Sequence, residues 1–170
     1  YLNNENTYTK FWFKKNNVNS SKIFKKYVQA IPKREEGFKI KIDEYEYLTT
    51  SSLSQEHKKY YQIHKNKKKL LLDVNKLAKN KDFYDISGIF PSRNHNFIAF
   101  GEDTKGRREF SIIIKNIKKN KLVDKNLCSS SGNIIWSLDS KGYFYLKKNQ
   151  KTLITDSLFF HKIGTDSKED

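Results

Sequence analysis

Three side chains near the end of the chain are of the types that form a serine hydrolase triad. Ser157 directly follows Asp156, and His161 lies four residues further on. In such a triad the serine attacks the substrate, the histidine takes its proton and the carboxylate orients the histidine. Residues this close along one chain do not usually converge in that geometry, so we interpret the match as one of composition only.

No other pattern in the chain predicts catalysis or metal binding. It has no Gly-x-Ser-x-Gly nucleophile turn, no His-Glu-x-x-His motif and no phosphate-binding glycine loop. The histidines are not spaced as ligands of one metal ion, with one another or with Cys128. His57 and His64 are predicted at the surface and His95 in a turn. We therefore expect no catalytic residue, no metal site and no cofactor.

The densest group of charges that could meet a partner lies in the segment Gly101–Phe110. Glu102 and Asp103 stand on one side of its tip, and Arg107 and Arg108 stand on the other. These are the only adjacent arginines in a chain dominated by Lys, and a guanidinium suits bidentate pairing with a carboxylate. The segment is either a solvated turn or a charged edge that contacts another domain or a peptide.

Two amphipathic helices are predicted in residues 1–31, ahead of the elements that would carry this hairpin. The first covers Leu2–Phe13, and the second has Ser20 or Ser21 as its N-cap and ends before Pro32. The second helix places its apolar residues on one face: Ile23, Phe24, Tyr27, Val28 and Ile31. Such faces must pack on something else.

After residue 37 the apolar residues alternate with polar ones, which is the pattern of β-strands. Thr49–Lys59 is predicted as a loop, Lys65–Lys69 and Lys118–Lys121 as solvated turns, and Asp73–Lys81 as a turn with a short helical piece. Strands are predicted at Phe38–Ile42, Tyr45–Leu48, Tyr60–Ile63, Leu70–Leu72, Ile86–Phe90, Phe97–Gly101, Glu109–Ile114, Asn133–Ser137, Tyr143–Lys147 and Leu158–Ile163.

A weak repeat supports an all-β architecture. Ser92–Asn94 precedes the strand that begins at Phe97, and Ser137–Asp139 precedes the next aromatic strand about 45 residues later. That spacing is the size of a four-stranded propeller blade. We predict a mainly β fold, with a helical arm in residues 1–36 and about two propeller blades in residues 37–170. Two blades do not close a ring, so an open apolar face is expected.

Composition narrows the possible classes of protein. The net charge is +15, but Lys is dispersed through nearly every segment, which favours a solvated surface over a nucleic-acid site. No stretch approaches the length of a membrane span. A single cysteine fits a reducing compartment, and we expect a cytoplasmic location. The chain starts with Tyr1 and has no Met, so we expect it to be part of a longer protein.

Several segments, in order along the chain, resemble the oligopeptidase B branch of the prolyl oligopeptidase family. They are Tyr1–Thr9, Ile31–Glu35, Leu71–Ala78, Phe83–Tyr84, Gly101–Phe110, Trp136–Ser140 and His161–Thr165. One departure is Ser92–Asn94, where the family has Ser-Pro-Asp.

The resemblance implies a seven-bladed propeller that covers the active site of an α/β-hydrolase domain, here truncated to its first blades. It also implies that the helical arm packs on this hydrolase domain, which carries the catalytic residues and is absent from the chain. The oligopeptidase B branch cleaves short peptides after Lys or Arg. Because the catalytic residues lie outside the 170 residues, these are expected to be inactive alone. The propeller would exclude large proteins, with Glu102, Asp103, Arg107 and Arg108 as the expected interdomain contacts.

Two other classes remain open from the residues themselves. One is a degenerate, stand-alone β-rich binding module. The other is a basic nucleic-acid-binding domain, whose binding would depend steeply on salt.

Overall fold

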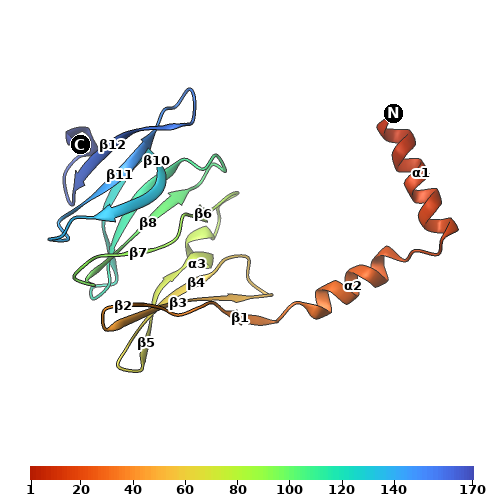
Figure 1. The fold of residues 1–170 in the computed structure, drawn as a ribbon, viewed down its shortest axis with the longest axis horizontal. Helices are drawn as coiled ribbons and strands as arrows, with labels where there is room; N and C mark the ends of the chain where they lie inside the picture. The colour runs from red at the N-terminus through yellow and green to blue at the C-terminus, as the bar shows by residue number, and fades with distance from the viewer.

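The computed structural model describes all 170 residues as a helical arm followed by two antiparallel sheets (Figure 1). No helix in it is long and apolar enough to cross a membrane. The helices are α1 (Leu2–Lys15), α2 (Ser20–Ala30), α3 (Val74–Ala78) and the 3-10 turn η1 (Ser167–Glu169). The strands are β1 (Arg34–Glu36), β2 (Ile40–Ile42), β3 (Tyr45–Ser52), β4 (Lys59–His64), β5 (Lys67–Asp73), β6 (Asp85–Ile86), β7 (Phe90–Pro91), β8 (Phe97–Asp103), β9 (Phe110–Asn116), β10 (Lys121–Trp136), β11 (Gly142–Lys148) and β12 (Thr155–Lys162).

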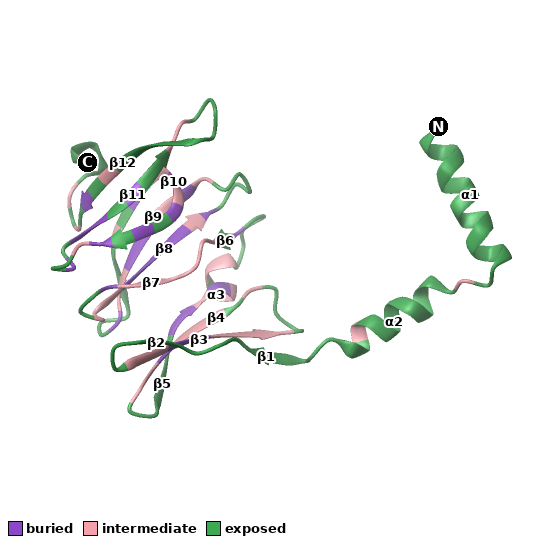
Figure 2. Ribbon diagram, in the orientation of Figure 1, coloured by how far each residue is buried: buried purple, intermediate pink, exposed green.

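The arm extends away from the sheets and buries none of the residues in its two helices (Figure 2). Both predicted helices are confirmed, but the N-cap of α2 is Asn19 rather than Ser20 or Ser21. The Asn19 side chain accepts a hydrogen bond from the Lys22 amide at 2.9 Å, which satisfies one of the free amides of the first turn. The apolar face of α2 is open, with Phe24 68% and Tyr27 71% exposed.

The first sheet has five strands, two of which share one edge. β1 and β2 pair with opposite ends of β3, and β4 and β5 follow in order. The sheet therefore begins at Arg34, inside the segment 1–36 that the sequence assigned to the arm. β3 also runs to Ser52, into the predicted loop Thr49–Lys59, because its Thr and Ser residues pair with β1 and β4. Lys67–Lys69 lie in β5, so the predicted turn Lys65–Lys69 is wrong beyond Asn66.

The second sheet is seven-stranded and continuous through β10. The first half of β10 pairs with β9 and the second half with β11, and the register shifts between Asn126 and Ser130. The sequence predicted only Asn133–Ser137 as a strand, because the polar first half of β10 has no apolar alternation. The predicted strand Ile86–Phe90 is also divided into β6 and β7, with Gly88 at a φ of +120° between them.

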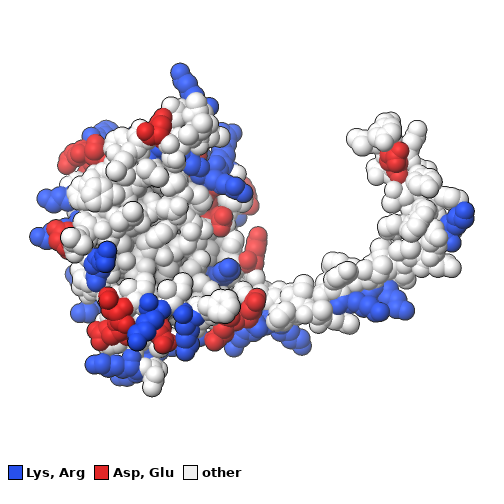
Figure 3. All heavy atoms as spheres, in the orientation of Figure 1, with Lys and Arg blue, Asp and Glu red and all other residues white.

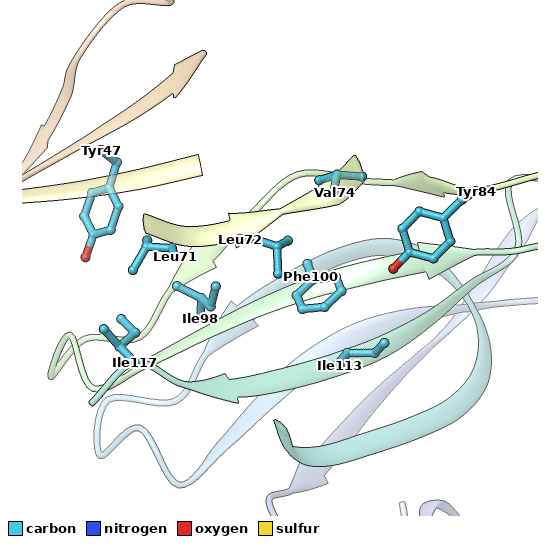
Figure 4. Packing of buried hydrophobic residues seen from close by; sticks show 9 residues of the cluster. All are labelled: Tyr47, Leu71, Leu72, Val74, Tyr84, Ile98, Phe100, Ile113 and Ile117. Atoms are coloured by element: carbon cyan, nitrogen blue, oxygen red, sulfur yellow. The ribbon is translucent and has the colours of Figure 1, made fainter. Parts of the chain in front are cut away.

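β8 and β9 form the centre of the fold because both of their faces are buried. On one face Ile98, Phe100, Ile113 and Ile117 pack against residues of β3, β5, α3 and the segment that follows α3 (Figure 4). On the other face Ala99, Ile112 and Ile114 pack against β10 and β11. The consecutive isoleucines of β9 are explained by this double burial, since a strand covered on both faces needs no polar side.

Candidate interdomain surface

Asp103 shapes the tip of the hairpin between β8 and β9. Its carboxylate accepts hydrogen bonds from the backbone amides of Lys105 at 2.8 Å, Gly106 at 3.0 Å and Arg108 at 2.7 Å. The residue is only 2% exposed. These three bonds hold the chain while Gly106 and Arg108 adopt positive φ values of +73° and +55°. Asp103 therefore organises the charged edge from within.

Glu102 ties this hairpin to two other parts of the chain. Its two carboxylate oxygens lie 3.0 Å from Lys81 Nζ and 2.9 Å from Lys125 Nζ, and its side chain is 10% exposed. Burial by itself raises the pKa of Glu102, but the hydrogen bonds from Lys125 and Lys81 outweigh it, and the pKa is lowered from its ordinary value of 4.5. Glu102 is thus held as a carboxylate that links β8, β10 and the segment after α3.

Arg107 and Arg108 present guanidinium groups to solvent, unlike the carboxylates of Glu102 and Asp103, which are bound within the chain. Both are exposed, and neither guanidinium makes an ion pair within the chain. The Arg108 carbonyl accepts a hydrogen bond from Lys148 Nζ, which fixes the backbone beneath the side chains. The pair is therefore placed for contact with a carboxylate outside these residues, and that contact stays a prediction.

A polar groove of about 400 Å³ lies at the base of the hairpin. Lys81, Glu102, Lys105, Glu109, Lys125 and Cys128 are among its lining residues. Burial raises the pKa of the Cys128 thiol. The polar lining of this groove offers ionic and hydrogen-bonding contacts to a partner.

The arm leaves the first sheet on the side of the molecule where β6 pairs with the base of the hairpin (Figure 1). Arg34 at the start of β1 pairs with Ser52, where β3 ends. The loop after β3 is joined to α3 by a hydrogen bond from the His57 amide to the Asn75 side chain at 3.0 Å. The segment after α3 then meets the hairpin through Lys81 and Glu102. Figure 1 shows the arm departing on the side where α3 and β6 lie.

The candidate triad does not assemble. The Ser157 hydroxyl donates to the adjacent Asp156 at 2.8 Å, while the His161 ring is engaged elsewhere. His161 Nδ1 lies 2.6 Å from Asp170 and Nε2 lies 3.0 Å from Asp124, so both ring nitrogens already have carboxylate partners. The chain also contains no group of three or more His, Cys, Asp or Glu residues that could hold a metal ion.

Two histidine networks, one buried around His161 and one partly exposed around His95, were not predicted from the sequence. His161 is fully buried, and His95, placed correctly in a turn, lies between Asp43 and the hydroxyl of Tyr47 at 2.8 Å from each. Each network joins residues that are tens of positions apart. The sequence carries no local signal for them, because the partners come from different strands and turns.

The whole chain, with its two antiparallel sheets and its exposed arm, matches a known domain family. A family model described as the N-terminal beta-propeller domain of prolyl oligopeptidase matches residues 1–170. The chain belongs to this family. The predicted fold class is thereby confirmed: a mainly β propeller portion with a helical arm at its N-terminus.

Individual relatives of this propeller domain include one curated protein and several solved structures. Dipeptidyl aminopeptidase BI of Pseudoxanthomonas mexicana is 33% identical over 101 residues, which cover 59% of this chain and 14% of that protein. Oligopeptidase B from Leishmania major is 24% identical with a TM-score of 0.80, covering 88% of this chain and 22% of that one. Oligopeptidase B from Trypanosoma brucei, in a closed form with covalently bound antipain, is 21% identical with a TM-score of 0.76, covering 88% and 21%.

The chain therefore spans about a fifth of the length of the solved relatives and a smaller part of the curated one. At these identities the likeness to the solved structures establishes the fold.

Proposed function

We propose that this chain is the propeller portion of a serine peptidase similar to oligopeptidase B, which hydrolyses short peptides after Lys or Arg. Catalysis would reside in a C-terminal α/β-hydrolase domain outside these residues. The family match over residues 1–170 carries the proposal. The cytoplasm is the proposed location, because the single Cys128 suits a reducing compartment.

The open apolar face of the arm supports this assignment. The side chains of Phe24 and Tyr27 are mostly exposed, as are those of Tyr8 and Phe11 on α1. A contiguous apolar surface of this kind usually marks an interaction site. In the proposed enzyme the arm packs on the hydrolase domain, and its amphipathic helices bury their apolar faces there.

The role proposed for the sheets is to limit access to the active site. The arm departs on the side of the molecule where β6 pairs with the base of the Glu102–Arg108 hairpin (Figure 1), so a domain that holds the arm would face the hairpin. Arg107 and Arg108 would then contact carboxylates of that domain or of a peptide. The closed form described for the Trypanosoma brucei relative supports such a movement between domains.

Dispersed charge argues against the nucleic-acid alternative. Lys and Arg are spread over the sheets and along the arm, with acidic residues between them (Figure 3). Nucleic-acid sites instead gather cations and stacking aromatics in one groove.

The decisive experiment uses the native polypeptide that carries this sequence. Its mass is measured first, and it is then assayed with short fluorogenic peptides that end in Arg, Lys or Pro before the reporter. We expect a chain several times longer than 170 residues that cleaves the Arg and Lys peptides and is blocked by a serine-directed phosphonate. A native product near 20.2 kDa without peptidase activity would instead support a stand-alone binding module. Cleavage after Pro alone would retain the family and reject the oligopeptidase B branch.

A further inference from the structure

A second groove, remote from the hairpin, lies at the seam between the two sheets. It has a volume of about 430 Å³ and is bounded by β5, α3 and the turn between β9 and β10. β5 is the outer edge strand of the first sheet. Four lysines from these elements line the groove: Lys69, Lys76, Lys115 and Lys118.

Two of these lysines are anchored across the seam. Lys69 of β5 donates from Nζ to the Ile117 carbonyl at 2.7 Å, and Lys115 of β9 donates to the Leu71 carbonyl at 2.6 Å. Lys69 thus reaches the turn that follows β9, and Lys115 reaches β5 of the first sheet. Because an ammonium carries three donors, each retains two for a further ligand.

Positive charge in this groove is not neutralised within the chain. None of the four lysines lies within 4.0 Å of a carboxylate, whereas Lys59, Lys68, Lys81 and Lys125 all form such pairs. Asp73 is the one acidic residue that lines the groove. Its carboxylate already caps α3 at the Asn75 amide, 3.2 Å away, and faces Lys59 at 3.7 Å.

The electrostatics of Lys115 reflect this excess. Burial, together with the nearby charge of Lys69, lowers the pKa of Lys115. The two ammonium groups are therefore close enough to repel each other, and an anion placed between them would relieve that repulsion.

We propose that this groove binds a compact, multiply charged phosphate anion, with Lys69 and Lys115 as the anchored contacts and Lys76 and Lys118 closing over it. The proposal is independent of the peptidase function, because none of the four lysines belongs to the arm or to the charged segment Glu102–Arg108.

The lining residues suit a multiply charged phosphate. All the cations in the groove are lysines, which bind phosphate as point charges, and four of them together favour an anion with more than one negative charge. The groove contains no aromatic side chain on which a nucleobase could stack. Inorganic pyrophosphate is therefore the appropriate probe.

Binding is measured on the native polypeptide by isothermal titration with pyrophosphate, and by the shift of its melting temperature. We expect saturable binding to one site, weakened at least tenfold by K69Q/K115Q. The exposed pair K76Q/K118Q, whose ammonium groups make no hydrogen bond in the fold, should weaken binding several-fold without affecting folding. The matched control K41Q/K162Q removes the same charge from exposed lysines outside the groove and should change the affinity less than twofold.

Three outcomes would overturn the proposal. They are no saturable binding, equal affinity in the wild type and the K76Q/K118Q variant, or an equal loss in the control pair. The last result would mean that pyrophosphate responds to net charge alone. The side chains of Lys76 and Lys118 make no hydrogen bond to the backbone, so K76Q/K118Q should fold. That variant therefore still tests the proposal if K69Q/K115Q fails to fold.

Discussion

Asn94 and Asp139 occupy the same position in two turns that are 45 residues apart. Asn94 Oδ1 accepts from the Ser92 hydroxyl at 2.8 Å and from the Asn96 amide at 3.0 Å. Asp139 Oδ1 accepts from the Ser137 hydroxyl at 2.7 Å and from the Lys141 amide at 3.0 Å. The weak sequence repeat is thus a repeat of hydrogen bonds, and the turn tolerates loss of both the Pro and the Asp of the family pattern.

This equivalence predicts how the first turn responds to substitution. Asn94→Asp keeps the acceptor oxygen and should leave stability almost unchanged, whereas Asn94→Ala removes it and should cost about 1 kcal/mol. Hydrogen exchange of the Asn96 amide in the native polypeptide measures the difference. Equal protection in both variants would contradict the role assigned to the side-chain oxygen.

Glu102 predicts a local loss of stability in acid. Because its folded-state pKa is below the ordinary 4.5, its stabilising contribution is complete at neutral pH and is lost as pH falls below about 4.5 through the folded value. Hydrogen exchange in the β8–β9 hairpin should therefore accelerate over that range. In Glu102→Gln the hairpin should already exchange faster at pH 7, with a smaller further change in acid. An unchanged acid response would contradict the assignment to Glu102.

Substitution of His161, which takes no part in a catalytic triad, should strongly lower the stability of the fold. His161→Ala leaves the Asp124 and Asp170 side chains, 8% and 1% exposed, without their shared partner. An unsatisfied buried polar group costs about 1–3 kcal/mol and a charged one more, so we expect a loss of about 3 kcal/mol.

The control for this variant is His64→Ala. Its partner Glu44 is 64% exposed, so the expected cost is below about 1 kcal/mol. Thermal unfolding of the native polypeptide compares the two. If the unpartnered carboxylates cause the loss, combining Asp124→Asn with His161→Ala should recover part of the stability. Similar melting points for His161→Ala and His64→Ala would refute the network.

At position 132 in β10 there is no room for a side chain larger than that of glycine. An added Cβ would lie 2.7 Å from Ser87 Cβ and 2.8 Å from Phe110 Cγ, and the residue has a φ of +84°. Gly132→Ala should therefore cost about 1–3 kcal/mol from overpacking in addition to backbone strain. Gly164 has a similar φ of +87° with no atom within 4 Å of an added Cβ, so Gly164→Ala isolates the strain. Equal melting points for these variants would reject the steric contribution.

The arm predicts an effect on the whole enzyme rather than on the sheets. Phe24→Ser with Tyr27→Ser removes apolar area from the face proposed to meet the hydrolase domain. Limited proteolysis of the native polypeptide should then cut the segment between α1 and β1 faster, with peptidase activity reduced. Lys25→Ser with Lys26→Ser on the same helix should have little effect, and equal sensitivity of the two variants would count against docking through the apolar face.

The sequence alone determined the local elements and the family. Alternating apolar residues predicted most of the strands, and Pro32 marked the end of the arm, because these signals depend on neighbours a few positions away. The strand that contains the isoleucines of β9 and the turn at Ser137 were predicted from the same kind of local signal. The ordered family segments then supplied the propeller architecture.

Only the tertiary structure decided which polar residues act together. The first half of β10 is a strand because β9 offers it partners, and its own residues carry no strand pattern. Asp103 was expected to face a partner, but three backbone amides of its own hairpin bind it. The lysine groove and the carboxylates around His161 arise where separate strands and turns meet. Hydrogen bonds and charge interactions depend on distances between residues far apart in the chain, and those distances exist only once the sheets have packed.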